Sequence, residues 1–415
     1  ARSPELGRDF GRAGRAHVLP RYSIPRLVDD VDTLYRTLLQ ERAPRSLRVY
    51  DELSIALRPA VPPRPERRAA SRRLRIALVS QYFPPEVGAT QSRIQAFADY
   101  LSERGHEVTV VCEFPNHPHG VIPERYAGKL VHVDRSNAYR ILRVWVKASP
   151  EKNQRTRMLF YLSYMGMATA SAPVLGRVDV VLATSPPLFA GVAGAALARL
   201  SGAPFVLDVR DLWPAAALSL DQVSGAPVRA VAERLERWLY REAAVVVAVT
   251  HPFCRHIDAL RGRAPSAVLI PNGTLDLFFE NGDGPRNRLG LSEDRFLVTF
   301  AGTHGIAQGL PAVLDAASLA RDASFAFVGD GPTKDLLERA AADRRLENVS
   351  FHPQVPMEEM PPILAGSDAL LVPLSSHATF AQFVPSKMVD FMASGKPVIL
   401  AAPGEPARLL ESAGG

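Results

Sequence analysis

The densest group of side chains that could do chemistry lies near the end of the chain, in residues 383–400. Pro385 and Ser386 predict the start of a short helix, whose free N–H groups would attract an anion. Lys387 adds a positive charge there, and Asp390 follows one turn later on the same face. A diphosphate could lie against the lysine while the carboxylate bonds to ribose hydroxyls. A capped surface helix with a Lys–Asp pair explains the same residues, so both interpretations stay open.

Three other segments place glycines between an expected strand and an expected helix, at residues 84–91, 300–310 and 327–332. Glycine lets a backbone approach a ligand closely, although an ordinary turn explains each segment equally well. The first segment contains no G-x-G-x-x-G, which argues against a nicotinamide cofactor. The candidates for contact with a phosphate or a sugar are Gly88, Gly302, His304, Gly305, Gln308 and Gly329.

Charged and polar residues also follow two expected strands in the first half of the chain, at residues 208–214 and 113–120. Arg210 and Asp211 could bind sugar hydroxyls or take part in proton transfer, and a buried salt bridge that orders the loop is the alternative. His117 and His119 lack a cysteine or carboxylate partner at a suitable spacing, so no metal site is expected.

The elements that must position these residues form two series of short apolar runs. Such runs, flanked by turn residues and alternating with helical segments, are typical of parallel strands covered on both faces by helices. The first series comprises residues 74–80, 108–112, 141–146, 178–183, 205–209 and 245–249, and the second comprises residues 296–301, 325–328, 349–351, 369–372 and 398–400. The sequence therefore predicts an α/β protein with two Rossmann-like doubly wound domains, residues 74–270 and 271–415, facing across a cleft.

The N-terminal region differs from the rest in composition. Residues 1–44 predict a helical appendage, in which Ser23 caps a helix with apolar residues at helical spacing. Residues 45–73 are rich in proline and arginine and read as a solvated linker. Residues 1–73 carry a net charge of +7 and the remainder −1, so charge gives no support for binding nucleic acid.

Composition limits the compartment and the membrane topology. Only Cys112 and Cys254 are present, so no disulfide framework is expected and a reducing cytoplasm fits. No signal peptide is visible at the start. The most apolar window, residues 159–175, contains Gly, Ser and Pro, and predicts a buried or interfacial helix rather than a membrane span.

These motifs, in this order, resemble the family 4 glycosyltransferases, and more narrowly bacterial surface-polysaccharide enzymes akin to N-acetyl-fucosaminyl transferases. The matching segments are residues 81–93, 114–120, 184–187, 208–214, 270–273, 301–310, 328–332 and 385–397. The resemblance implies a GT-B fold, a nucleotide sugar held mainly by the C-terminal domain and an acceptor on the N-terminal domain. It also implies retention at the anomeric carbon, no essential metal and no cofactor, with a UDP-linked donor preferred to a GDP-linked one.

The resemblance also suggests a role for each candidate residue. Lys387 would stabilise the charge that develops on the leaving diphosphate, and Asp211 is the second catalytic candidate. Where the wider family carries two glutamates seven residues apart, this chain has Gln382 and Asp390. The candidates for binding the donor are Gly88, Gly302, His304, Gly305, Gln308, Gly329, Gln382, Ser386, Lys387 and Asp390, and those for binding the acceptor are Arg93, Asn116, His117 and Arg210.

The first 40 residues resemble the closing helices of a GT-B glycosyltransferase, although they stand at the other end of the chain. One hypothesis is a fragment of a tandem protein, with the tail of one unit, a linker and most of a second unit. The alternative is that residues 1–40 fold back and complete this unit, as in a circular permutation.

The expected partners are a nucleotide sugar and a lipid-linked or growing glycan acceptor in surface-polysaccharide synthesis. Arg155 and Arg157, with Lys152, stand beside the apolar residues 158–162 and could contact an anionic membrane. The expected location is the cytoplasm, at the inner face of the cell membrane. Two other functions remain open: a noncatalytic nucleotide-sugar-binding scaffold and a GT-B sugar-nucleotide 2-epimerase.

Overall fold

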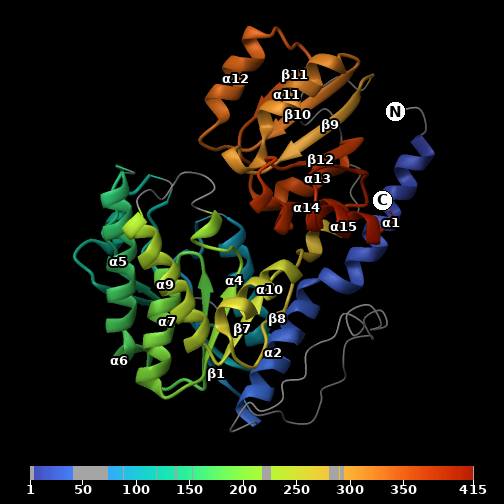
Figure 1. Ribbon diagram of the computed structural model, residues 1–415. Helices are drawn as coiled ribbons and strands as arrows, with labels where there is room; N and C mark the ends of the chain where they lie inside the picture. The colour runs from blue at the N-terminus through green and yellow to red at the C-terminus, as the bar shows by residue number, and fades with distance from the viewer. Residues whose placement is uncertain are drawn as a thin grey trace. The chain divides into compact units, whose positions relative to one another are not determined.

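The computed structural model describes residues 4–40, 73–279, 289 and 294–414, except for residues 87, 118, 136, 137, 152 and 217–225. The chain divides into two compact units. The N-terminal unit is Leu27–Pro271, and the C-terminal unit joins Ala1–Arg26 to Asn272–Gly415. Each unit is a Rossmann-like sheet flanked by helices, so the predicted α/β class with two such domains is confirmed (Figure 1). The break after Pro271 lies next to the predicted domain boundary.

The N-terminal unit is built on an eight-stranded sheet in the order β3-β4-β2-β1-β5-β6-β7-β8. Neighbouring strands are parallel except β3 and β4, which pair antiparallel at one edge. The strands are β1 (Arg75–Val79), β2 (Glu107–Glu113), β3 (Val131–Asp134), β4 (Arg140–Val144), β5 (Val180–Ser185), β6 (Phe205–Val209), β7 (Val245–Ala248) and β8 (Val268–Leu269). The sequence did not predict β3 or β8, because one is a half-buried edge strand with polar residues and the other has two residues.

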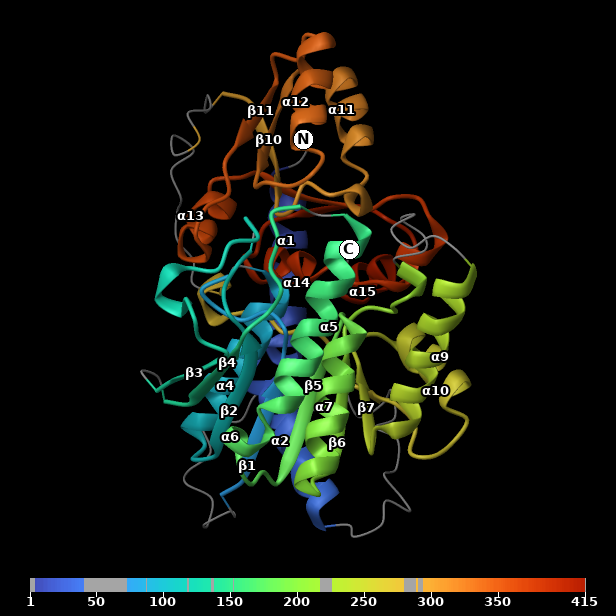
Figure 2. The same cartoon turned by 90° about the vertical axis from the view of Figure 1, so that its left-hand side faces the viewer.

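Helices cover both faces of this sheet. In chain order they are α2 (Ile24–Gln40), α4 (Ala89–Glu103), η1 (Glu124–Tyr126), α5 (Gln154–Ala170), α6 (Ala172–Leu175), α7 (Leu188–Ser201), α9 (Ala226–Glu242) and α10 (His251–Arg261). Helices α5, α7 and α9 lie side by side on one face (Figure 2). Helix α7 sits very close to the sheet, because a Cβ on Gly194 would lie only 2.4 Å from the Cβ of Ala183.

The C-terminal unit has a five-stranded parallel sheet in the order β11-β10-β9-β12-β13. Its strands are β9 (Phe296–Ala301), β10 (Ala323–Val328), β11 (Val349–His352), β12 (Ala369–Pro373) and β13 (Val398–Ala401). Its helices after residue 272 are η2 (Asp276–Phe278), η4 (Ile306–Gln308), α11 (Leu310–Leu319), α12 (Lys334–Asp343), η5 (Met357–Glu359), α13 (Met360–Ala365), η6 (Ala378–Gln382), α14 (Ser386–Ala393) and α15 (Glu405–Ser412). Successive side chains alternate between two cores: Phe327 and Leu371 face the first, and Val328 and Val372 face the second.

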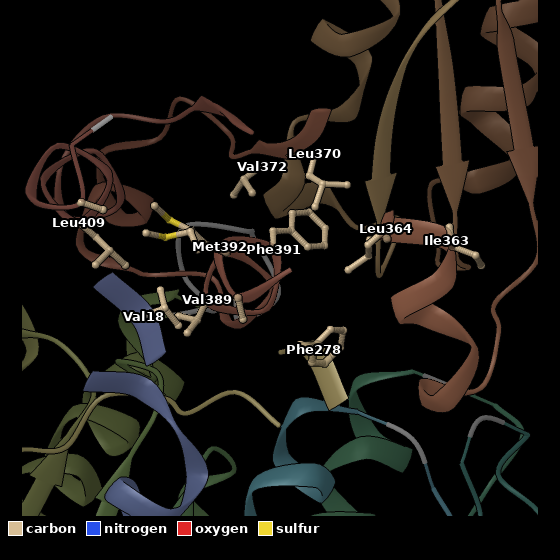
Figure 3. Packing of buried hydrophobic residues seen from close by; sticks show 14 of the residues in the cluster. Val18, Phe278, Ile363, Leu364, Leu370, Val372, Val389, Phe391, Met392 and Leu409 are labelled. Carbon is tan, nitrogen blue, oxygen red and sulfur yellow. The ribbon is translucent and has the colours of Figure 1, made fainter. Parts of the chain in front are cut away.

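The first helix of the chain, α1 (Pro4–Tyr22), belongs to the C-terminal unit and packs along α14. Val18 is fully buried in the same core cluster as Val389, Met392 and Leu409 (Figure 3). The two backbones approach closely where α1 carries glycine, because a Cβ on Gly11 would lie 2.0 Å from a backbone oxygen of the facing segment.

Helix α2 continues into the N-terminal unit, where Asp29 forms an ion pair with Arg104 at the end of α4. Its buried residues are Leu27, Val28, Val31, Leu34 and Tyr35. Asp32 accepts hydrogen bonds from Arg36 and lies 3.1 Å from His106, which follows α4. Burying each large apolar side chain contributes roughly 1.5–3 kcal/mol, so this helix is integral to the unit. Residues 4–40 therefore fold onto this chain, and their relation to a preceding unit stays a prediction; the predicted linker lies outside the described residues except Arg73.

Candidate functional site

The loops that follow β9 and β10 lie side by side in the C-terminal unit, at the carboxyl ends of parallel strands. Gly302 follows β9 with φ 129° and Gly329 follows β10 with φ 141°, a region that favours glycine. A Cβ on Gly329 would lie 2.1 Å from the carbonyl oxygen of Gly302. The Gly329 loop can approach the backbone of Gly302 this closely only because position 329 carries no side chain. Ligands of such sheets bind beyond these strand ends.

Lys387, on the first turn of α14, points its ammonium group at the same place. Its Nζ lies 3.9 Å from the centroid of the Phe300 ring, and a Cβ on Gly302 would be 2.8 Å from it. This nitrogen is buried and has no hydrogen-bond partner in the part of the chain that the structure describes. Burial lowers the pKa of Lys387 from 10.5 to about 7. An enclosed cation without an anion is costly, and a bound anion would remove that cost.

His304 is fully buried beside Lys387, with its ring among Phe300, Phe327 and Phe351. Neither ring nitrogen has a hydrogen-bond partner among the residues that the structure describes. Burial, reinforced by the nearby charges of Lys334 and Lys387, lowers its pKa to about 4. The ring is therefore neutral at pH 7 and is turned into the aromatic cluster, while the predicted contact with the donor stays a prediction.

Asp390 lies one turn beyond Lys387 and is held by a residue that sequence reasoning did not select. It accepts a hydrogen bond of 2.7 Å from the hydroxyl of Thr274, which lies 116 residues earlier in the chain. Burial raises the pKa of Asp390 to about 7, against the lowering effect of that hydrogen bond. Thr274 directly follows the 270–273 motif, and that motif was the sequence signal that could have pointed to it.

The remaining donor candidates lie in nearby turns or at the start of α14. Gln308 ends η4, and its side-chain oxygen would be 2.7 Å from a Cβ on Gly305. Gln382 ends η6, and Ser386 is the first residue of α14. Gly88 belongs to the N-terminal unit, where it precedes α4 in an extended conformation. Contact of these residues with a donor stays a prediction.

In the N-terminal unit, Arg93 on α4 forms a buried ion pair with Asp208 at the end of β6. Its two guanidinium nitrogens lie 3.0 and 3.2 Å from the carboxylate oxygens, and the side chains are 4% and 1% exposed. Arg93 also stacks over Phe97 at 4.9 Å and donates to the carbonyl of Pro271. The structural alternative that we considered for the 208–214 loop, a buried salt bridge, therefore exists, with Arg93 as the partner of Asp208.

Arg210 and Asp211 follow β6 directly and retain unsatisfied buried atoms. Within the described residues, Nε of Arg210 and Oδ1 of Asp211 have no hydrogen-bond partner. Burial raises the pKa of Asp211 to about 7, a value suited to proton transfer near neutral pH. Burial, followed by repulsion from Arg93, lowers the pKa of Arg210 to about 10.

Asn116 belongs to a buried network of acids and amides after β2. Its side-chain amide donates to Glu113 at 2.7 Å, and Gln81 donates to the other Glu113 oxygen at 2.9 Å. Glu86 accepts from the backbone N–H groups of Asn116 and His117, both at 2.8 Å. Burial, with repulsion from Glu86, raises the pKa of Glu113 well above its usual value. Sequence reasoning selected Asn116 and His117 but missed the two glutamates that hold this loop.

Metal ligands and membrane spans were also sought in the described part of the chain. Within it, no group of three or more His, Cys, Asp or Glu side chains could hold a metal ion. Among the same residues, none of the helices combines the length and apolar character that crossing a membrane requires.

Comparisons with known proteins match both units. Residues 88–273 match the Glycosyl transferase 4-like domain, and residues 295–414 match Glycosyl transferases group 1. The chain is 26% identical over 344 residues to the putative colanic acid biosynthesis glycosyl transferase WcaI of Escherichia coli, covering 79% of this chain and 83% of that protein.

Two solved structures show the same fold at low identity. Sucrose-phosphate synthase from Thermosynechococcus elongatus has a TM-score of 0.61 at 17% identity, covering 80% of this chain and 82% of that one. Anabaena HepE, in complex with UDP and glucose, has a TM-score of 0.57 at 17% identity, covering 82% and 89%. The chain belongs to the GT-B glycosyltransferases of the family 4 type, with a 4-like domain followed by a group 1 domain.

Proposed function

We propose that the protein transfers a sugar from a nucleoside diphosphate donor, preferably UDP-linked, to a glycan acceptor in surface-polysaccharide synthesis, with retention at the anomeric carbon. One observation carries the donor assignment: the enclosed ammonium of Lys387 lies against the Gly302 loop and has no hydrogen-bond partner among the described residues. The diphosphate is the anion that this cation lacks. The UDP bound by HepE supports a nucleoside diphosphate donor, and the similarity to a putative colanic acid glycosyl transferase supports a polysaccharide product.

The proposed reaction relies on electrostatics supplied by the protein. Negative charge grows on the leaving diphosphate as the glycosidic bond breaks, and Lys387 with the free N–H groups of α14 stabilises it. Asp390 accepts hydrogen bonds from the ribose once it is ionised. In this proposal no metal or cofactor is required, so turnover is insensitive to EDTA.

The acceptor is proposed to bind the N-terminal unit near Asp211, Arg210 and the 113–120 loop. A buried carboxyl with a pKa of about 7 can exchange a proton with an acceptor hydroxyl at neutral pH. Arg93 supports this region through Asp208, because its guanidinium is already paired with both carboxylate oxygens of that residue.

We further propose a lipid-linked acceptor, reached at the inner face of the cell membrane. On α5 the apolar side chains of Met158, Leu159 and Leu162 are exposed, next to the exposed Arg155 and Arg157. Apolar groups beside basic groups suit the surface of an anionic membrane. Sedimentation with vesicles that contain anionic lipid tests this proposal, which predicts that Leu159→Ser with Leu162→Ser reduces binding.

The decisive experiment is a screen of the protein against UDP- and GDP-sugars with glycan acceptors, read out as nucleotide release. The proposal predicts release that depends on the acceptor and prefers a UDP-sugar. Lys387→Met should lower turnover about 10²–10³-fold, the usual cost of removing a group that stabilises transition-state charge. Lys147→Met removes an exposed lysine elsewhere and should leave turnover unchanged.

The outcomes separate the alternatives. Donor binding without acceptor-dependent release would identify a noncatalytic scaffold. Release of free nucleotide with epimerised sugar and no acceptor would identify a 2-epimerase. Lys387→Met activity within a factor of about two of the parent would overturn the role of this lysine.

A further inference from the structure

A second basic site lies at the antiparallel edge of the N-terminal sheet. It is a cavity of about 450 Å³, here called the edge pocket. Its floor is formed by β3 and β4, where His132 pairs with Arg143 and Asp134 with Ile141 across the two strands. Further lining residues are Phe83, Pro84, Pro85, Gln95, Arg125, Tyr126, Lys129 and Tyr139. A cavity of this size accommodates a small ligand.

Arg143 is the buried charge of the edge pocket. The residue is 4% exposed, and its Nε has no hydrogen-bond partner. One terminal nitrogen donates to the carbonyl of Pro84 at 2.6 Å, and the other lies 3.6 Å from the sulfur of Cys112. Neither of these two neighbours carries a negative charge, so neutral groups fix the guanidinium in place. Such a group is ready to accept an anion.

Two further cations stand on the wall of the edge pocket. Arg125 and Lys129 are exposed, and among the described residues neither forms an ion pair. The guanidinium of Arg125 lies 4.9 Å from the centroid of the Tyr126 ring, which stacks on Phe114 at 4.6 Å. Lys129 is one of six lysines in a chain with 43 arginines. Asp134 is the single acid of the lining, so positive charge predominates.

The position of the edge pocket links it to the acceptor side of the protein. Pro84 and Pro85 line it, and they also begin the 84–91 loop that leads into α4. Glu86, the next residue, holds Asn116 and His117 in the proposed acceptor region. The lining of the edge pocket is thus continuous in sequence with the acceptor loops of the same unit.

We propose that the edge pocket binds a phosphoryl group of the acceptor. Three cations around a cavity, one of them rigid and planar, match the several oxygens of a phosphate or diphosphate. This proposal rests on the proposed transferase function, because it assigns the anion to the acceptor substrate. A free phosphorylated metabolite offers the same chemistry, and the experiment below separates the two sources.

The first arm measures binding of inorganic pyrophosphate by calorimetry to the full chain with Lys387→Met, which removes the cation of the donor site. The Arg125→Gln, Lys129→Gln pair should weaken binding at least about tenfold, since it removes two of three cations. The control pair, Arg234→Gln with Arg237→Gln on α9, makes the same charge change at exposed positions and should leave affinity unchanged. Asp134→Asn should strengthen binding. Equal loss in both pairs, or loss in neither, overturns the site.

The second arm uses chains with Lys387 intact and separates the KM of a phosphorylated acceptor from donor hydrolysis without acceptor. The Arg125→Gln, Lys129→Gln pair should raise that KM about tenfold and leave donor hydrolysis unchanged. If pyrophosphate binding falls while the acceptor KM does not, the ligand is a free metabolite and the acceptor assignment is overturned. Failure of the proposed function is distinguishable, because the parent chain would then release no nucleotide from any donor while still binding pyrophosphate.

Discussion

Two buried charges, one in each unit, are satisfied in different ways. In the N-terminal unit, the guanidinium of Arg93 meets both carboxylate oxygens of Asp208 within 3.2 Å. In the C-terminal unit, the ammonium of Lys387 is enclosed against Phe300 and has no hydrogen-bond partner among the residues described there. The first charge is already satisfied by the protein, whereas the second is satisfied only by something that binds. A buried charge that is paired within the protein therefore indicates a structural role, and a buried charge without a partner indicates a ligand-binding site.

Burial also shifts the pKa values of the two ionisable groups on this face of α14. Burial lowers the pKa of Lys387 to about 7. It raises the pKa of Asp390, one turn away, to about 7 as well. Both groups are thus poised to titrate at physiological pH, where binding of a charged donor can bias them.

The largest effect is expected from breaking the pair in the N-terminal unit. Arg93→Met leaves Asp208 buried without its cation and should lower the free energy of unfolding by about 3–5 kcal/mol. Adding Asp208→Asn removes the stranded charge and should recover part of the loss. Urea unfolding followed by fluorescence measures both. A loss below about 1 kcal/mol for Arg93→Met would mean that the pair is not the structural element we describe.

The opposite sign is expected for Lys387. Its pKa is lower in the folded protein than in the unfolded chain, so the unfolded state binds more protons between pH 7 and 10.5, and stability rises with pH in that window. The gain between pH 7 and 9 should be about 2 kcal/mol. Lys387→Met should be more stable than the parent at pH 7 and lack this rise. Equal pH profiles for the two proteins would contradict an enclosed, unpaired ammonium.

The sequence predicts the strands, helices and candidate residues of both regions better than it predicts which residues those candidates contact. Lys387 and Asp390 could be found because helix periodicity alone puts them on one face, and Gly302 and Gly329 because each follows an apolar run. Their surroundings depend on contacts that span the chain. Thr274 meets Asp390 across 116 residues, and Arg93 meets Asp208 across 115. No local pattern encodes such pairs.

The orientation of His304 and the place of α1 have the same explanation. The ring of His304 lies among phenylalanines from three different strands, so its inward direction follows from their packing. Helix α1 packs on α14, which is separated from it by more than 360 residues. The sequence suggested that residues 1–40 could fold back, but not which glycine would face which segment.

A matched pair of substitutions in α1 tests that packing. A Cβ on Gly11 would lie 2.0 Å from the backbone oxygen of Gly395, whereas one on Gly14 would lie at an ordinary 3.6 Å from Met392. Gly11→Ala should therefore lower the free energy of unfolding by about 1–2 kcal/mol. Gly14→Ala should be neutral or stabilising, because alanine is the better helix former. Thermal unfolding of both variants measures this, and equal midpoints would exclude the close approach at Gly11.

The smallest effect expected, and the most direct test of the comparison, is the pH dependence of donor binding. Protonated Lys387 favours the diphosphate below about pH 7, and ionised Asp390 favours the ribose above about pH 7. UDP affinity should therefore pass through a maximum near pH 7 and fall several-fold by pH 6 and pH 8, roughly 1 kcal/mol on either side. His304, with a pKa of about 4, does not titrate in this window.

Two variants test which residue causes the fall in UDP affinity on each side of the maximum. Asp390→Asn should abolish the fall on the acid side and keep the fall on the alkaline side, and Lys387→Met should do the reverse with weaker binding throughout. Calorimetry with UDP measures affinity directly, so the titration of Asp211, which concerns turnover, does not enter. A parent profile that is flat from pH 6 to 8 would show that neither group senses the donor. The C-terminal unit would then hold an unpaired charge for a reason other than binding, and the contrast with Arg93 and Asp208 would lose its functional meaning.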